Sequence, residues 1–250
     1  MVVSWIVFAC IFVGALLGMF VRAALPEGYL RSDTKDVVGR AIGLIMTIAA
    51  VVLGLLVASA KSSYDMKSGQ IKQMTANIIL LDRILEEYGP ETDTARDLMR
   101  RSIAPLVDRI WRESVPSSAK VTPLDVNPAA ETVYYKIQEL APRNDVQRSL
   151  QARAIQISTD LAQTRFLLFE ETGNSIPIPF LSVLVFWLTI IFASFGLFAR
   201  PNAIVIATLF VCALSASSAI FLILDLDRPF IGVMSISSAP MRNALAPLGP

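Results

Sequence analysis

The sequence contains no histidine, and this absence removes the commonest general base, metal ligand and proton relay of proteins. Cysteine is almost as scarce. Cys10 and Cys212 are the only two among 250 residues, so the chain has no disulfide framework and no zinc motif. Phosphate-binding loops and dinucleotide-binding fingerprints are also missing from the sequence. We therefore expect no enzymatic activity, no cofactor and no metal site.

Charge is limited as well, and it is unevenly distributed. Only 17% of the residues are charged, and the net charge of +1 argues against a nucleic-acid-binding face. A helix of about 20 residues crosses the ~30 Å hydrocarbon core of a bilayer and satisfies its own backbone there. Four stretches of that length hold no Lys, Arg, Asp or Glu: Val2–Val21, Ala41–Ala60, Phe180–Ala199 and Ala203–Leu224. The sequence therefore predicts an all-α integral membrane protein with four transmembrane helices, two near each end of the chain.

The lipid bilayer is thus the first expected partner of the chain. Hydrophobic residues make up 54% of the sequence, more than ordinary soluble domains use. Cys10 and Cys212 both lie within predicted spans, and we interpret them as small apolar core residues.

The long polar segment between the two pairs of apolar stretches predicts a helical extramembrane domain. Its positive and negative charges nearly cancel, as expected for a solvated surface. The predicted organisation has four parts: a first transmembrane hairpin (1–60), the helical domain (61–178), a second transmembrane hairpin (179–226) and a C-terminal tail (227–250).

Helix signals divide the polar segment further. No Gly or Pro follows Ala60 closely, so the second span is expected to continue as a helix up to Gly89. Pro105 is expected to kink or split the next helix. Three prolines predict an irregular connection over 115–128, followed by a short helix over 129–140. Asn144 or Asp145 is expected to cap a last helix that ends before Gly173.

Three local patterns, in this order along the chain, resemble those of the bestrophin family. The second span closes with Ser62-Ser63-Tyr64-Asp65. The third opens with Ile176-Pro177-Ile178-Pro179-Phe180. The fourth closes with Asp225-Leu226-Asp227-Arg228-Pro229-Phe230-Ile231-Gly232. They are similar to the Ser-Tyr-Asp, Pro-Ile-Pro-Phe and Asn-Pro-Phe-Gly elements of bestrophins, and the chain looks like a bacterial bestrophin-like protein.

This resemblance implies a homo-oligomeric ion channel, a pentamer in the family, whose second helix lines the pore. Aligning Tyr64 with the family places Ala50, Gly54 and Ala58 near the neck of the pore. All three are small, whereas the family's neck is built from bulky apolar residues. The same spacing also suits close packing of helices in lipid, so pore lining and helix packing both remain open.

Residues at the membrane boundary form a second group of candidates: Tyr64, Asp65, Asp225, Asp227 and Arg228. We expect them to couple the spans to the helical domain. In animal bestrophins, acidic residues near this region help to bind calcium. Here the positions after Gly232 lack acidic residues, so we favour pairing of the two aspartates with Lys61 or Arg228, or capping of nearby backbone.

The function expected from the sequence is a bestrophin-like channel for a small inorganic ion, with an anion slightly favoured. The alternative is a non-conducting membrane scaffold that assembles with another protein. Basic residues are divided almost equally between the two sides of the membrane, so they predict no orientation. The resemblance implies the inner membrane of a bacterium, with the large domain in the cytoplasm.

Overall fold

The computed structural model describes residues 2–24, 32–112, 128–170, 178–199 and 201–245. Within these ranges the chain is helical and contains no strand, as predicted. It forms two compact units. Unit 1 comprises residues 1–63 and 174–227, and unit 2 comprises residues 64–173 and 228–250.

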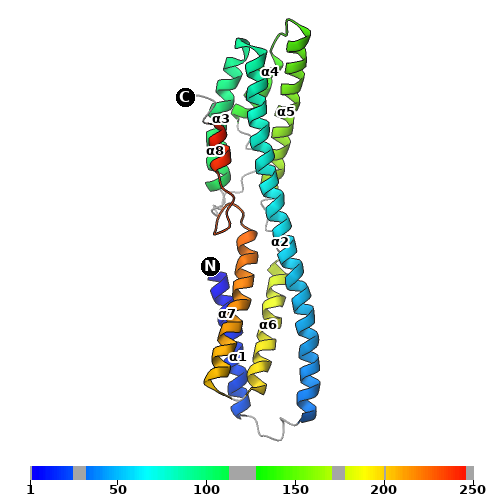
Figure 1. Cartoon of the computed structure of the whole chain (residues 1–250), viewed down its shortest axis with the longest axis vertical. Helices are drawn as coiled ribbons and strands as arrows, with labels where there is room; N and C mark the ends of the chain where they lie inside the picture. The colour runs from blue at the N-terminus through cyan, green and yellow to red at the C-terminus, as the bar shows by residue number, and fades with distance from the viewer. Residues whose placement is uncertain (1, 25–31, 113–127, 171–177, 200, 246–250) are drawn as a thin grey trace. The chain divides into compact units, whose positions relative to one another are not determined.

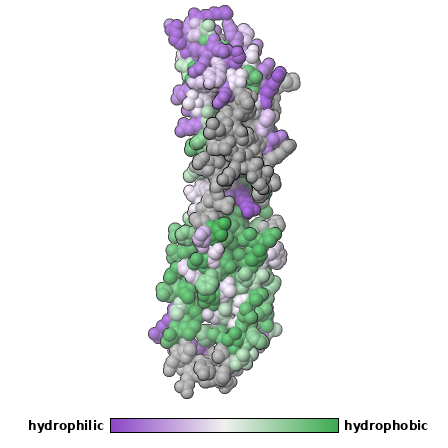
Figure 2. Space-filling view, turned by 180° about the vertical axis from the view of Figure 1, so that it is seen from behind, coloured by the Kyte–Doolittle hydropathy of each residue, from purple (hydrophilic) through white to green (hydrophobic). Residues whose placement is uncertain are grey.

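Unit 1 contains the four apolar helices (Figure 1): α1 (Val2–Ala24), the first part of α2 (Ser32–Tyr88), α6 (Ile178–Phe198) and α7 (Ala203–Leu226). Each is long and apolar enough to cross a membrane. Hydrophobic side chains dominate the surface of these helices in Figure 2. Trp5 and Phe20, for example, are 67% and 73% exposed, which suits lipid rather than water as the surrounding medium.

The two cysteines correct one expectation from the sequence. Cys10 and Cys212 are both exposed within one chain, so their interpretation as core residues is wrong. In a membrane helix the outward face borders hydrocarbon, and a small apolar residue fits there as well as in a core.

Helices α1 and α6 are in backbone contact. A Cβ atom placed on Gly18 would lie 1.9 Å from the carbonyl oxygen of Ala193, and one on Gly196 would lie 2.0 Å from that of Ala15. Only glycine fits at either position. Because Gly14 and Gly18 of α1 face Thr189 and Ala193 in the same order, the two helices run parallel. This is the small-residue packing that stabilises helix pairs in lipid.

Two polar contacts reinforce the packing of α1. The Arg22 guanidinium donates to the carbonyl oxygen of Phe198 at 2.8 Å, at the C-terminal end of α6, where a cation suits the helix dipole. On the other side, the Ser217 hydroxyl of α7 donates to the carbonyl oxygen of Ser4 at 2.7 Å. The first helix is therefore held by both helices of the C-terminal pair.

Unit 2 is a helical bundle with its own core. It contains the end of α2, α3 (Asp93–Arg112), α4 (Pro128–Gln138), α5 (Asp145–Glu170) and the short α8 (Ala239–Leu245). Apolar residues recur at helical spacing along α2 and α3 and meet in this core. Its most buried members include Met74, Leu81, Leu85, Val107, Ile137 and Met241.

Several helix boundaries follow the sequence signals. α2 ends at Tyr88 because Gly89 adopts a φ of 127°, which favours glycine. The side chain of Asn144 accepts a hydrogen bond from the Gln147 backbone at 2.7 Å and so caps α5. Pro105, in contrast, does not split α3, which continues through it as one helix. Residues 115–127 of the expected connection and the Gly173 helix end lie outside the described residues.

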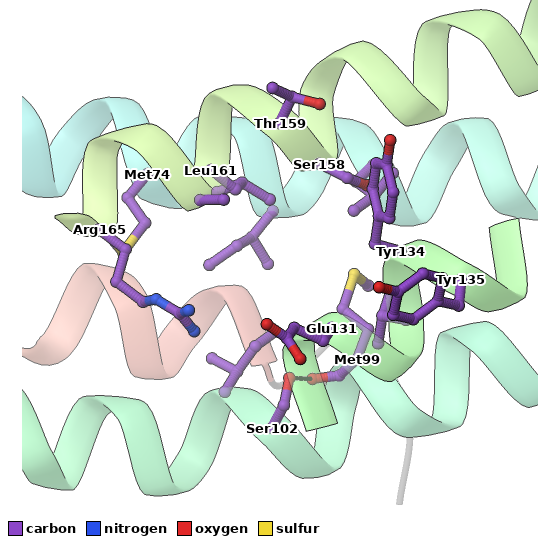
Figure 3. A pocket seen from close by; sticks show the side chains of 15 residues that line it. Met74, Met99, Ser102, Glu131, Tyr134, Tyr135, Ser158, Thr159, Leu161 and Arg165 are labelled. Atoms are coloured by element: carbon purple, nitrogen blue, oxygen red, sulfur yellow. Dashed lines mark hydrogen bonds between the residues drawn. The ribbon is translucent and has the colours of Figure 1, made fainter. Parts of the chain in front are cut away.

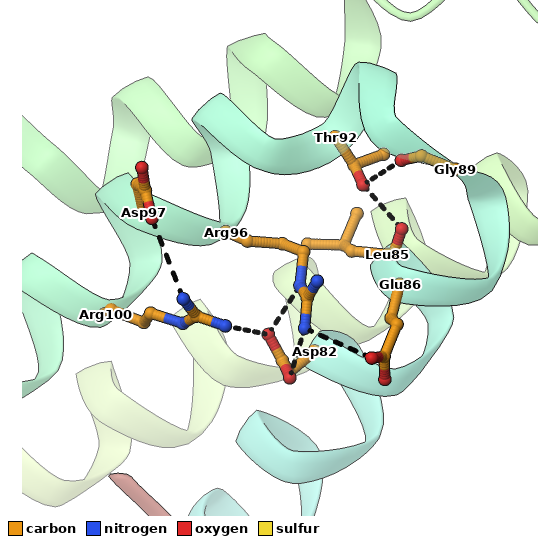
Figure 4. A network of polar contacts seen from close by, with 8 residues as sticks. All are labelled: Asp82, Leu85, Glu86, Gly89, Thr92, Arg96, Asp97 and Arg100. Atoms are coloured by element: carbon orange, nitrogen blue, oxygen red, sulfur yellow. Dashed lines mark hydrogen bonds and ion pairs between the residues drawn. The ribbon is translucent and has the colours of Figure 1, made fainter. Parts of the chain in front are cut away.

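An ion-pair network joins α2 to α3 (Figure 4). Arg96 donates two hydrogen bonds to the buried carboxylate of Asp82, at 2.9 and 3.0 Å. The hydrogen bond to Asp82 raises the pKa of Arg96 above its already high ordinary value, so the guanidinium stays charged. Arg100 lies 3.9 Å from the same carboxylate. The network fixes the register of the two helices.

Residues 228–245 pack within unit 2. The indole nitrogen of Trp111 donates to the carbonyl oxygen of Ile236 at 2.9 Å, and its ring packs edge-on against Phe230. Arg242 of α8 pairs with Asp108 at 3.3 Å, and Met241 is fully buried. The sequence of this short C-terminal segment gives little sign that it packs against α3, because Trp111 and Asp108 lie far from it in the sequence.

Candidate functional site

Within unit 1, α2 is covered along a single stripe. Its buried residues there are Ile42, Ala49, Leu56 and Ala60, which recur at spacings of seven and four and therefore share one face. The remaining faces of this part of the helix are open within one chain. A long apolar helix with most of its circumference uncovered requires lipid, another copy of the chain or a water-filled space around it.

The three candidate neck residues lie on the open side of α2. Ala50 and Ala58 are exposed, and a Cβ placed on Gly54 would have no atom of another helix within 4 Å among the residues that the structure describes. A Cβ placed on Gly39 or Gly43 of this helix would likewise have no described atom of another helix within 4 Å. Packing of these small residues against another helix of the same chain, the alternative to pore lining, is therefore not seen among the described residues. Their contribution to a pore remains a prediction.

Large apolar residues share the open side with the small ones but lie at a different angle. Leu44, Val51 and Leu55 are 64%, 58% and 65% exposed. Successive residues of a helix are turned by about 100°. Leu55 is thus turned well away from Gly54. The open side of α2 presents a bulky hydrophobic surface on one flank and a nearly smooth, small-residue surface on the other.

Basic side chains stand at both ends of this small-residue surface. Arg40 immediately precedes the apolar stretch of α2 and Lys61 immediately follows it, and both are exposed. The acidic residues Asp36 and Asp65 are also exposed but lie one turn farther out. The charges nearest to the small residues are therefore positive.

The five boundary candidates are divided between the two units. Tyr64, Asp65 and Arg228 belong to unit 2, and Asp225 and Asp227 belong to unit 1. Asp227 ends α7, with its backbone N–H donating to the carbonyl oxygen of Ile223 at 3.1 Å. Their coupling across the membrane boundary stays a prediction.

The segment after α7 forms a defined loop. The N–H of Ile231 donates to the carbonyl oxygen of Arg228 at 3.1 Å, and the N–H of Ile236 donates to that of Pro229 at 2.7 Å. Gly232 has a φ of 126°, a conformation that L side chains rarely adopt. This geometry explains why the pattern ends in glycine. In the residues that the structure describes, no group of three or more His, Cys, Asp or Glu could hold a metal ion.

A family model named the bestrophin-like domain matches residues 9–241, which is most of the chain. The chain belongs to the bestrophin-like family. No curated protein matches its sequence. The match extends over the four apolar helices and the helical unit between them, so it agrees with the resemblance carried by the three local patterns. Of those patterns, Ile176 and Pro177 lie outside the described residues, and Pro179 lies in the first turn of α6.

Solved bestrophins share the fold of this bestrophin-like chain. One structure of a bacterial bestrophin homologue from Klebsiella pneumoniae aligns with a TM-score of 0.65 at 14% identity and covers 97% of each chain. A second variant of that homologue aligns with a TM-score of 0.63 at 16% identity, covering 95% of this chain and 97% of the other. At such identities the likeness concerns the fold alone.

The packing glycines of α1 were not anticipated from the sequence. Gly14 and Gly18 have the same four-residue spacing as Ala50, Gly54 and Ala58, and this spacing is the signal that could have identified them. Spacing alone does not distinguish the two helices. In the structure the glycines of α1 meet α6, whereas none of the described helices packs against Gly54.

Proposed function

We propose that this protein is a homo-oligomeric ion channel of the bestrophin-like family, with the small-residue face of α2 lining a central pore. The observation that carries the proposal is the uncovered face at Ala50, Gly54 and Ala58. Small residues there, exposed within the described part of the chain, suit a surface that faces water along a symmetry axis. One chain cannot enclose such a space, so the pore requires several copies.

The number of copies that we propose is five, as in the family that the chain resembles. The bulky flank at Leu44, Val51 and Leu55 would then face lipid or the next subunit. A neck built from Ala50, Gly54 and Ala58 lacks the large side chains that narrow other bestrophin pores. We therefore infer a wider passage at this level of the membrane.

Anions are the favoured permeant ions. Arg40 and Lys61 stand at the two ends of the small-residue surface, and symmetry would repeat them as two basic rings. A ring of like charges attracts ions of the opposite sign and repels those of the same sign. We place the channel in the inner membrane of a bacterium with unit 2 in the cytoplasm, in keeping with the family resemblance.

Substitution of Gly54 tests the proposal directly. Gly54→Trp adds a large ring to the small-residue face and should reduce anion flux into liposomes about tenfold or more. Leu55→Trp is the matched control, because it adds a ring to the adjacent residue on the bulky flank and should leave the flux within about twofold. Equal flux through both variants, with each protein correctly assembled, would show that α2 does not line the pore at this level.

Assembly and conduction separate the channel from the alternative scaffold. Native mass spectrometry in mild detergent should give a single closed oligomer, and a stable monomer would contradict the ring. An intact oligomer that passes neither chloride nor potassium would instead favour a non-conducting assembly partner of another protein.

A further inference from the structure

A cavity of about 390 Å³ lies inside unit 2, between α2, α3, α4 and α5 (Figure 3). Its volume falls in the range of pockets that hold small organic ligands. The wall is mainly apolar, and six of its side chains are more than nine-tenths buried: Met74, Ile78, Leu81, Met99, Ile103 and Val133. Two of them are methionines, whose flexible thioethers adapt to the shape of a guest.

The aliphatic hydroxyl groups of the lining are already engaged with their own helices. Ser102 donates its hydrogen to the carbonyl oxygen of Met99 at 2.7 Å. On α5, Ser158 and Thr159 donate to carbonyl oxygens one turn earlier, at 2.8 and 3.0 Å. Each hydroxyl group has a single hydrogen to donate. These three residues therefore have no hydrogen left for the carboxylate or phosphate of an anionic guest.

The two charged residues of the lining have opposite signs, and neither needs a charged ligand. Glu131, in the first turn of α4, is exposed to water. Arg165 of α5 already takes part in an interaction within the chain. A cation or an anion in the cavity would meet a like charge as well as an opposite one. Either ion would also lose its hydration beside an apolar wall, which costs free energy.

We propose that this cavity binds a small uncharged hydrophobic molecule, of which an aromatic alcohol is the simplest case. The apolar body of the guest would lie among Met74, Leu81 and Met99, where burial of apolar surface favours binding. The rings of Tyr134 and Tyr135 meet edge to face and add aromatic surface to the lining. Selection would therefore depend on shape and hydrophobicity rather than on charge.

We expect this guest to arrive from water rather than from lipid. The part of α2 that lines the cavity lies beyond its apolar stretch, and the exposed residues of the lining include the polar Glu131 and Thr159. The site lies wholly within unit 2. The inference therefore goes beyond the channel function and does not depend on ion conduction or on the lining of the pore.

Three probes of one shape test the charge requirement. 3-Phenyl-1-propanol is uncharged, 3-phenylpropylamine is a cation at neutral pH, and 3-phenylpropionate is an anion. NMR follows the isotope-labelled methionine methyl groups of the full-length chain, freed of lipid and held in amphipol. The alcohol should shift the signals of Met74 and Met99 saturably, but not that of Met241, which is buried in the same unit outside the cavity. Each charged probe should bind about tenfold more weakly.

Equal binding of all three probes, or no saturable shift with the alcohol, would overturn the proposal. Signals that move only after phospholipid is added would also overturn it, because the guest would then be an acyl chain.

Substitutions then locate the site. Ala162→Trp adds a ring to the lining from α5 and should weaken binding of the alcohol about tenfold or more, because the ring takes the space of the guest. Ala152→Trp is the matched control, since it adds the same ring at an exposed position of α5 that does not line the cavity. Glu131→Gln should leave the affinity for the alcohol unchanged, and a loss of binding there would contradict the uncharged class of the guest.

Ser158→Phe provides a second way to fill the cavity where Ala162→Trp impairs folding. It should likewise weaken binding of the alcohol. Undiminished binding in both variants, with an unchanged Tm, would place the ligand elsewhere and contradict the assignment.

Discussion

At the scale of single residues, glycine has two different tasks in the membrane helices of this protein. Gly18 permits backbone contact between α1 and α6, and any side chain there would collide with the carbonyl group of Ala193. A side chain at Gly54 would meet no other helix in the described part of its own chain. Both positions hold glycine within an apolar stretch of sequence, but only Gly18 packs against another helix. Substitution of the two glycines should therefore have different effects.

Substitution by alanine at these two positions should change the stability of the protein by different amounts. Gly18→Ala should lower the stability by about 2 kcal/mol, because α1 and α6 must separate to admit the methyl group. Gly54→Ala fills open space and should leave the stability nearly unchanged. Thermal unfolding in detergent, followed by circular dichroism, measures both. A Gly18→Ala protein as stable as the parent would show that the two backbones are not in contact.

A second prediction concerns the buried carboxylate of Asp82. Asp82→Asn removes the buried, hydrogen-bonded partner of Arg96 and leaves its guanidinium only the exposed carboxylate of Glu86, 3.9 Å away, which should cost about 3 kcal/mol of stability. Asp145→Asn is the control, because Asp145 is 94% exposed and its pairing with Arg148 is worth less than about 1 kcal/mol. Chemical denaturation measures the free energy of unfolding of both variants. Equal losses of stability would show that burial of Asp82 does not strengthen its ion pair.

At the scale of elements, the docked C-terminal segment depends on one aromatic residue of α3. Trp111→Phe keeps an aromatic ring against Phe230 but removes the N–H that donates to Ile236, at a cost of about 1 kcal/mol. We expect faster hydrogen exchange over 233–245 in this variant. Trp5→Phe, at an exposed position of α1, is the control and should leave hydrogen exchange over 233–245 unchanged. Unaltered exchange in Trp111→Phe would show that the hydrogen bond does not hold the segment.

The elements themselves were largely predictable from the sequence. The absence of charge defined the four apolar helices, Gly89 marked the end of α2, and Asn144 marked the start of α5, since each signal acts within a few residues of its effect. Pairing between distant helices was not predictable. Nothing near Gly18 indicates that Ala193 will meet it, and nothing near Ile236 indicates that Trp111 will bind it. Cys10 and Cys212 were misjudged because hydropathy does not distinguish a core from a lipid-facing surface.

The candidate site was anticipated only in part. The positions of Ala50, Gly54 and Ala58 came from the spacing to Tyr64, and the structure adds that their face is uncovered. The cavity that Met74, Met99 and Leu161 line in unit 2 (Figure 3) gave no sequence signal, since its walls come from four helices.

At the scale of the whole molecule, the proposed channel would select ions by charges that its symmetry repeats. Lys61 ends the apolar stretch of α2 on its open side. In a ring, Lys61→Gln removes one positive charge per subunit and should lower the chloride-to-potassium permeability ratio about threefold. Reversal potentials in planar bilayers under a salt gradient measure this ratio. Lys72→Gln, farther along α2, is the control, and an identical ratio in all three proteins would show that Lys61 does not face the permeating ions.

The backbone contact of α1 with α6, at Gly18 and at Gly196, also has a consequence for how the protein is made. During translation α1 leaves the ribosome first, whereas its parallel partner α6 follows only after α2, α3, α4 and α5. The nascent α1 must therefore remain in the bilayer, with its surface at Gly14 and Gly18 not yet packed against α6, until the last two helices are inserted. Helices that enter lipid singly and associate later can tolerate this delay. Truncation before Ile178 should leave α1 without its partner and make the unfinished chain a substrate for membrane proteases.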